Sequence, residues 1–219
     1  MTVVLLGGLG TTTRIWAGVP DGLALDLPGH GSSPPPGGKV SVETIARDVL
    51  AAVPGQFTFC GLSLGGFVGM WLGVHAPERV EQLVLVCTGA KIGTREDYYA
   101  RAALVRREGL EPLVAGARER WFTEDFRDDP RAEAVLDDLR GVSREGYAAC
   151  AEAVGDWDFR GEVVRISVPT RVIFGRDDPV TTPEVKRQLS LFASVEIPGA
   201  HLAPVESPDE FNHHLRSAA

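Results

Sequence analysis

The chain has 219 residues, of which 44% are hydrophobic and 24% charged, and its formal net charge is −8. This size and composition are typical of one soluble globular domain, and they exclude a disordered tail, a collagen-like repeat and a disulfide-rich miniprotein. No apolar stretch approaches the ~18 residues of a membrane-spanning helix. The acidic charge disfavours nucleic acid as a partner, because phosphate binding needs clustered lysine and arginine.

Six short apolar runs alternate with amphipathic stretches along the chain. The runs cover residues 3–6, 23–27, 57–60, 83–87, 171–174 and 194–197. Helical patterns cover residues 41–52, 64–75 and 183–192, and a last helix begins at the capping sequence Ser207-Pro208-Asp209-Glu210. Strands that are apolar on both faces suit a sheet covered by helices on both sides. The sequence therefore predicts a doubly wound, mostly parallel six-stranded α/β sheet.

Residues 91–168 interrupt this alternation. They hold no strand pattern, and helical patterns cover residues 94–108, 110–120, 129–140 and 143–154. We expect a core made of residues 1–90 and 169–219 and a helical lid made of residues 91–168, placed over the carboxyl edge of the sheet.

The three cysteines and the first residues indicate the compartment. The chain has an odd number of cysteines, Cys60, Cys87 and Cys150, and no two of them have the spacing of metal ligands. The amino terminus has neither the basic region nor the cleavage pattern of a signal peptide. We therefore expect reduced, buried cysteines in a cytoplasmic protein.

The segment from Gly61 to Gly65 reads GLSLG and has the form G-x-S-x-G. It directly follows the apolar run that ends at Cys60, and a helical pattern begins at Leu64. In this spacing the serine occupies a sharp strand-to-helix turn, where its hydroxyl stands clear at the helix amino terminus. A serine in a glycine-rich loop is the alternative, but the flanking strand and helix favour Ser63 as a nucleophile.

A serine nucleophile needs a base, and five histidines compete for that role. His201 follows the last apolar run, at the carboxyl edge of a parallel sheet where ligands bind, so we predict that it is the base. His213 and His214 fall within the last helix and are expected at the surface. His75 lies at a helix end, and His30 is expected to stabilise a turn.

The remaining parts of such a site are a carboxylate that orients the base and two N–H groups that bind an oxyanion. Asp177 and Asp178 both follow the fifth apolar run. We choose Asp178, with Asp177 as the alternative, and expect one of the two to cap the turn before a proline. For the oxyanion hole we predict the amides of Leu64 and Leu9, although a structural turn is the alternative at Leu9.

Taken together, these segments resemble the α/β-hydrolase superfamily. The matches are DLPGHGSS at residues 26–33, GLSLG at 61–65, APERV at 76–80, GRDD at 175–178 and AHL at 200–202, in the chain order serine, aspartate, histidine. The insertion is similar to that of the 3-oxoadipate enol-lactonase branch. That similarity rests on ERWFTEDFR at 119–127, YAACAEA at 147–153, DWD at 156–158 and AHLAPVE at 200–206.

The chain departs from these relatives at its beginning. Relatives usually open with an antiparallel hairpin before the strand found here at residues 2–7, and residues 16–23 leave little room for the usual joining helix. We expect either a minimal version of the fold or an edge covered by a partner, such as a second copy in a dimer. Many relatives also carry His-Gly where this chain has Gly7-Gly8, which puts the details of the oxyanion loop in question.

The resemblance implies hydrolysis of a carboxylic ester or lactone through an acyl-enzyme on Ser63, with no metal and no organic cofactor. An enol-lactone of this kind carries a carboxylate, which implies a cation near the pocket. Arg14, Arg120, Arg140 and Arg176 are the candidates. Trp121 is a further candidate for substrate binding, although a tryptophan at helical spacing also suits the core of the insertion.

Several other activities use the same residues. A thioesterase, a carbon–carbon bond hydrolase and a cofactor-free haloperoxidase or perhydrolase all remain open, whereas a dehalogenase would need aspartate in place of Ser63. A non-catalytic binding protein of the same fold is the alternative from another class. Such proteins usually lack the serine, the histidine or the oxyanion loop, and this chain retains all three.

Overall fold

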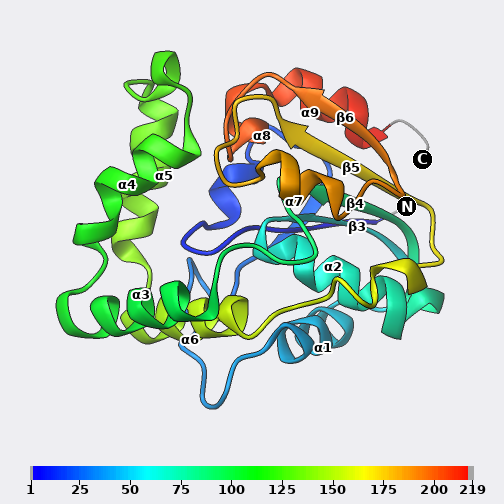
Figure 1. Ribbon diagram of the computed structural model, residues 1–219, viewed down its shortest axis with the longest axis horizontal. Helices are drawn as coiled ribbons and strands as arrows, with labels where there is room; N and C mark the ends of the chain where they lie inside the picture. Colours follow the sequence, from blue (N-terminus) through cyan, green and yellow to red (C-terminus); the bar gives the residue numbers. More distant parts are fainter. Residues whose placement is uncertain (1, 217–219) are drawn as a thin grey trace.

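The computed structural model describes residues 2–216 and contains a six-stranded sheet whose neighbouring strands are all parallel (Figure 1). The strands are β1 (Val3–Leu6), β2 (Gly22–Leu25), β3 (Phe57–Leu62), β4 (Val80–Val86), β5 (Thr170–Gly175) and β6 (Ala193–Ile197), in the order β2-β1-β3-β4-β5-β6. Each predicted apolar run corresponds to one strand, which confirms the predicted α/β sheet. Within residues 2–216, every helix is too short or too polar to cross a membrane.

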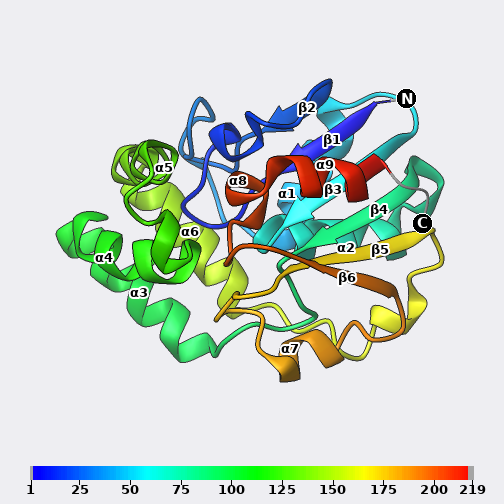
Figure 2. The ribbon, with the colours of Figure 1, turned by 90° about the horizontal axis from the view of Figure 1, so that it is seen from above.

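Helices cover both faces of this sheet, as expected for strands that are apolar on both sides (Figures 1 and 2). One face packs against α1 (Val42–Ala52), α2 (Leu64–His75) and the segment that includes α7 (Pro183–Arg187). The other face packs against a 3₁₀ helix (Thr13–Trp16) and α9 (Pro208–Arg216). Phe59 and Cys60, neighbours on β3, belong to the two opposite cores.

The helix ends follow their capping residues, with two differences from the prediction. Ser41 caps α1 in a capping box with Thr44, whose N–H donates to the Ser41 hydroxyl at 3.1 Å. The helix predicted to extend to residue 192 ends at Arg187, because the following backbone hydrogen bonds join residues three apart and form turns that lead into β6. The short helix α8 (Ala203–Glu206) lacks a sequence prediction.

Four α-helices lie between β4 and β5, as predicted for this region, together with two short 3₁₀ helices at Glu124–Phe126 and Val163–Arg165. The α-helices are α3 (Arg95–Glu108), α4 (Glu111–Trp121), α5 (Pro130–Gly141) and α6 (Arg144–Gly155). In Figure 2 these helices stand beyond the carboxyl ends of the strands. We refer to α3–α6 as the helical insertion; its role as a lid remains a prediction.

Candidate active site

Ser63 lies at the junction between β3 and α2, in the sharp turn that the G-x-S-x-G spacing predicts. Its backbone has φ 55° and ψ −111°, a conformation that is strained for a residue with a side chain. The flanking glycines are required by close packing: a Cβ on Gly61 would lie 2.1 Å from the Gly65 carbonyl oxygen, and one on Gly65 would lie 2.2 Å from that of Leu6. The Thr88 hydroxyl donates to the Ser63 carbonyl at 2.8 Å and supports the turn.

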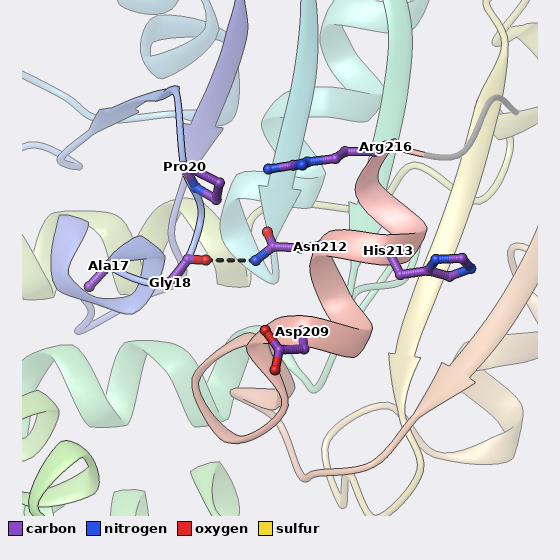
Figure 3. Close-up of a pocket in the computed structure, with 7 residues that line it drawn as sticks. All are labelled: Ala17, Gly18, Pro20, Asp209, Asn212, His213 and Arg216. Carbon is purple, nitrogen blue, oxygen red and sulfur yellow. Dashed lines mark hydrogen bonds between the residues drawn. The ribbon is translucent and has the colours of Figure 1, made fainter.

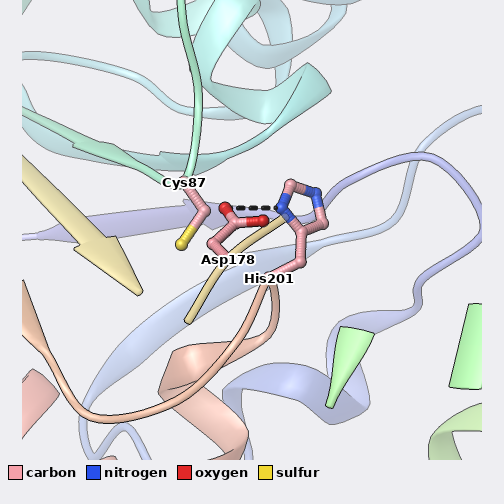
Figure 4. Close-up of side chains that lie close together, drawn as sticks. All are labelled: Cys87, Asp178 and His201. Carbon is pink, nitrogen blue, oxygen red and sulfur yellow. Dashed lines mark hydrogen bonds and ion pairs between the residues drawn. The ribbon is translucent and has the colours of Figure 1, made fainter. Parts of the chain in front are cut away.

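His201 and Asp178 form a buried pair at the carboxyl edge of the sheet (Figure 4). The distance from His201 Nδ1 to Asp178 Oδ2 is 3.0 Å. Asp178 also accepts hydrogen bonds from the Val180 N–H at 2.8 Å and the Thr181 hydroxyl at 2.6 Å. Asp177, the alternative in the sequence, is exposed and lines a separate surface hollow. The structure therefore places Asp178 against the histidine.

The surroundings of Asp178 keep its carboxylate charged. Burial by itself raises the pKa of this group, but the positive charge of protonated His201 and the hydrogen bonds from His201, Thr181 and Val180 outweigh that effect. The pKa of Asp178 consequently lies below its ordinary value. A charged carboxylate at Nδ1 holds the tautomer in which His201 Nε2 is free to accept a proton.

Cys87 completes a cluster with this pair (Figure 4). The side chains of Cys87, Asp178 and His201 belong to types that can bind metals. Within residues 2–216 they form the group of three such side chains whose candidate ligand atoms all lie within 4.8 Å of one another. Burial, followed by the charge of Asp178, raises the pKa of the Cys87 thiol well above its ordinary value, so the thiol stays protonated, and its sulfur accepts the Gly175 N–H at 3.3 Å. We interpret the cluster as an acid–base pair beside a packed thiol. The three cysteines are free and buried, as predicted.

The amides predicted for the oxyanion hole remain available. Among the described residues, neither the Leu9 N–H nor the Leu64 N–H donates a hydrogen bond to a protein acceptor. Leu64 is the first residue of α2, where backbone N–H groups lack helical partners. The loop bearing Leu9 approaches Ser63 closely, since a Cβ on Gly8 would lie 3.0 Å from the Ser63 Cβ.

His30 holds this loop in place, beyond the turn-stabilising role predicted for it. The imidazole is fully buried; Nδ1 lies 3.0 Å from the Pro28 carbonyl oxygen, and Nε2 accepts the Gly10 N–H at 3.0 Å. Burial lowers the pKa of His30 to about 4, so the ring is neutral near pH 7. A neutral ring with its proton on Nδ1 makes both contacts at once, and thereby fixes the residue that follows Leu9.

We expect His30→Ala to lower kcat by about 10- to 100-fold, because a misplaced oxyanion donor weakens transition-state binding.

The pH dependence of stability gives a second measurement of the role of His30. Since folding lowers the His30 pKa from 6.5 to about 4, its contribution to stability is present above pH 6.5 and is lost as the pH falls toward 4. In denaturant unfolding at several pH values, the free energy of unfolding should fall less steeply with decreasing pH in His30→Ala than in the wild type. Exposed His213→Ala is the control, and unchanged kcat in His30→Ala would contradict this role.

A cavity of about 390 Å³ contains both Ser63 and His201. Besides these two residues and Leu9, the helical insertion supplies much of its wall, through Tyr98, Arg101, Leu113, Ala117, Arg120, Trp121, Leu139, Tyr147 and Val154. This volume is within the range of small-molecule sites. Trp121 lines the cavity and is also buried in the core of the insertion, and its contact with a substrate stays a prediction.

Only one of the four candidate arginines lines this cavity. Arg120 does so, whereas Arg14 binds Asp138 at the surface and Arg140 pairs with the carboxylates of Glu111, Glu133 and Asp137. Arg176 is exposed outside the cavity. Of the four candidates that the sequence left open, Arg120 is thus the one at this cavity: Arg14 and Arg140 are held by neighbouring carboxylates, and Arg176 follows β5 on the outer surface.

Arg101, on α3, is a cavity residue that the sequence analysis missed. Its guanidinium lies 5.0 Å from the Tyr98 ring centroid, and Tyr147 lines the same cavity wall. Within residues 2–216, neither Arg101 nor Arg120 forms a salt bridge with a carboxylate. Burial, and then the charge of Arg101, lowers the pKa of Arg120. Positive charge thus accumulates at this wall of the cavity.

A second hollow lies away from Ser63, between residues 17–20 and α9 (Figure 3). It is larger, at about 770 Å³, and its lining residues are Ala17, Gly18, Pro20, Asp209, Asn212, His213 and Arg216. Asn212 donates to the Gly18 carbonyl at 2.6 Å across it. The lining residues of this hollow include neither serine nor cysteine, whereas Ser63 and His201 both line the cavity described above.

Comparisons with known proteins agree with this geometry. Residues 3–214 match the model of the alpha/beta hydrolase family. The 3-oxoadipate enol-lactonase 2 of Acinetobacter baylyi is 40% identical over 206 residues, which cover 89% of this chain and 77% of that protein.

Solved structures give the same result. The enol-lactonase from Burkholderia xenovorans LB400 superposes with a TM-score of 0.88 at 33% identity, covering 98% of this chain and 89% of that one. The malate-bound thermophilic esterase from Thermogutta terrifontis superposes with a TM-score of 0.89 at 26% identity, covering 99% and 88%. With its parallel sheet, its Ser63 turn and these matches over nearly its whole length, the chain belongs to the alpha/beta hydrolase family.

Proposed function

We propose that this chain is a serine hydrolase that cleaves a carboxylic ester or lactone bearing a carboxylate. Among such substrates, we propose that 3-oxoadipate enol-lactone is the preferred one. The observation that carries the proposal is a single cavity that contains Ser63 together with His201, which is itself paired with buried Asp178. Relatives named as enol-lactonases and an esterase support the ester and lactone class.

The proposed reaction is acyl transfer to water in two steps. His201 Nε2 takes the proton of the Ser63 hydroxyl as its oxygen attacks the carbonyl carbon, and Asp178 stabilises the resulting imidazolium. The amides of Leu64 and Leu9 bind the tetrahedral oxyanion. Collapse breaks the ester bond, and His201 protonates the leaving oxygen, which remains attached to the acyl group in a lactone. His201 then deprotonates a water molecule that attacks the acyl-enzyme. The bond between the acyl carbon and the Ser63 oxygen breaks, His201 returns the proton to that oxygen, and the carboxylic acid product leaves.

Positive charge in the cavity favours an anionic substrate over a neutral one. Arg101 and Arg120 line the same cavity as Ser63 without a salt-bridge partner among the described residues. Two unneutralised guanidinium groups near one another are unfavourable unless an anion binds between or beside them. The esterase relative is described with malate, a dicarboxylate, bound. These observations support recognition of a substrate carboxylate by the insertion.

A substrate comparison tests the proposed function. Purified protein is assayed with 3-oxoadipate enol-lactone, a neutral aryl ester, an acyl thioester and a vinylogous diketone. We expect the highest kcat/KM with the enol-lactone and measurable turnover of the aryl ester. A higher kcat/KM with the thioester or the diketone would replace the substrate assignment, and no turnover of any substrate would contradict the hydrolase assignment.

Replacing Arg101 or Arg120 with methionine should weaken use of carboxylate-bearing substrates selectively. A hydrogen bond to a charged group contributes about 1.5–3 kcal/mol, so we expect kcat/KM for a carboxylate-bearing aryl ester to fall about 10- to 100-fold. The rate with the matching neutral ester should change less than about twofold, since it lacks the charged contact. Steady-state kinetics on both esters measures the difference.

Arg176→Met serves as the control, because Arg176 is exposed outside the cavity. Equal losses on the charged and the neutral ester would indicate a structural role for Arg101 and Arg120 and contradict carboxylate recognition.

A further inference from the structure

Glu206, the last residue of α8, joins the loop that carries His201 to the end of helix α4. One carboxylate oxygen of Glu206 accepts the Ala200 N–H at 2.8 Å. The same carboxylate accepts the Thr123 N–H at 3.3 Å and the Thr123 hydroxyl. A single side chain therefore bonds the residue before His201 and a residue of the helical insertion.

A second hydrogen bond lies on the other side of His201. The Leu202 N–H donates to the Trp121 carbonyl oxygen at 3.0 Å. The backbone on both flanks of His201 is thus tied to residues 121–123, directly at Leu202 and through Glu206 at Ala200. Arg131 of α5 adds a contact, because its guanidinium donates to the Val205 carbonyl at 3.3 Å.

The tied segment of the insertion also forms the substrate cavity. Arg120 and Trp121, in the last turn of α4, line the cavity that contains Ser63. Residues that would contact substrate are therefore one or two positions along the chain from the hydrogen bonds that hold the His201 loop. His201 has its own carboxylate in Asp178, so Glu206 is not needed to orient the imidazole tautomer.

We infer that Glu206 is a positioning residue, which sets the distance between the His201 base and the substrate-binding end of α4. The inference rests on the proposed function, since it assumes that His201 is the base. Its physical reason is geometric. Proton transfer requires the base within about 3 Å of the Ser63 hydroxyl, and a misplacement of about 1 Å costs on the order of 10²-fold in rate. The hydrogen bonds that Glu206 accepts from Ala200 and Thr123 hold the loop and the insertion in one arrangement.

The test compares Glu206→Ala, Glu206→Gln and Thr123→Val with the wild-type chain. For Glu206→Ala we expect kcat for a carboxylate-bearing aryl ester to fall about 10- to 100-fold, with KM changed less than about threefold. Glu206→Gln should recover most of kcat, because its amide oxygen still accepts the Ala200 N–H. Thr123→Val, which removes only the hydroxyl bond, should lower kcat by a smaller factor.

Non-additivity distinguishes a shared link from two separate structural effects. In the double variant Glu206→Ala/Thr123→Val, we expect no loss of kcat beyond that of Glu206→Ala alone, because both changes break the same connection. Multiplicative losses would overturn the inference. Glu210 is an exposed acidic residue on α9. The control variant Glu210→Ala should keep wild-type kcat.

The outcomes separate this inference from the proposed function. An inactive wild-type chain that fails to react with a fluorophosphonate contradicts the proposed function itself. An active wild-type chain whose Glu206→Ala variant keeps kcat within about twofold overturns the inference alone. If Glu206→Ala does not fold, Glu206→Gln and Thr123→Val decide: full activity in Thr123→Val, measured well below its Tm, overturns the link to the insertion.

Discussion

Ser63→Ala is expected to lower kcat for an activated aryl ester by at least about 10⁴-fold, while the protein remains folded. The change removes the oxygen that would form the acyl-enzyme, and the base and the oxyanion amides alone provide far less rate enhancement. Steady-state kinetics with the purified variant measures the effect. Ser63 is held in a strained turn by neighbouring glycines, and alanine keeps the same Cβ, so the turn itself should persist.

Ser190→Ala provides the matched control, because Ser190 is an exposed serine in the turns before β6. It should retain wild-type kcat. Turnover by Ser63→Ala at a rate near that of the wild type would remove Ser63 as the nucleophile, and the acyl-enzyme pathway with it.

Asp178→Asn is expected to lower kcat by about 10³- to 10⁴-fold with little change in KM. The substitution removes the negative charge that stabilises imidazolium, and an amide no longer selects the tautomer with the proton on Nδ1. The Asp178 carboxylate is buried and bonded to Val180, Thr181 and His201. Among the described residues, no other acid hydrogen bonds with the His201 ring, so none can take over this role. Kinetics across pH 5–9 would measure kcat, and circular dichroism would verify the fold.

The neighbouring variant Asp177→Asn tests the choice between the two aspartates. Asp177 is exposed and its backbone N–H bonds to the Gly199 carbonyl, so its side chain is free to change without effect on His201. We expect wild-type kcat. A large loss in Asp177→Asn together with a small one in Asp178→Asn would contradict the geometry described above.

Local signals in the sequence account for most of the fold and for the core of the candidate site. Each buried strand appears as a short apolar run, and Ser41 marks the beginning of α1 through its side-chain bond to Thr44. The turn at Ser63 is equally local, because the glycines that permit it lie two residues away on either side. Asp178 and His201 could be placed because each follows a strand whose carboxyl end meets the same edge of the sheet.

The contacts that the sequence could not provide depend on how distant helices pack. Arg101 reaches the cavity because α3 packs against α6, an arrangement that no spacing within α3 predicts. His30 was assigned to a turn from its local sequence, whereas its bond to Gly10 joins residues 20 positions apart. The link from Glu206 to Thr123 spans 83 residues and follows only from the position of the insertion above the sheet.

Covalent labelling shows whether Ser63 is a nucleophile that His201 activates. The intact protein is treated with a fluorophosphonate, and mass spectrometry of the whole chain and of its peptides locates the adduct. We expect one adduct per chain on Ser63, formed rapidly in the wild type and much more slowly in His201→Ala. A folded wild-type chain that remains unlabelled, or that carries the adduct on another residue, would contradict this expectation.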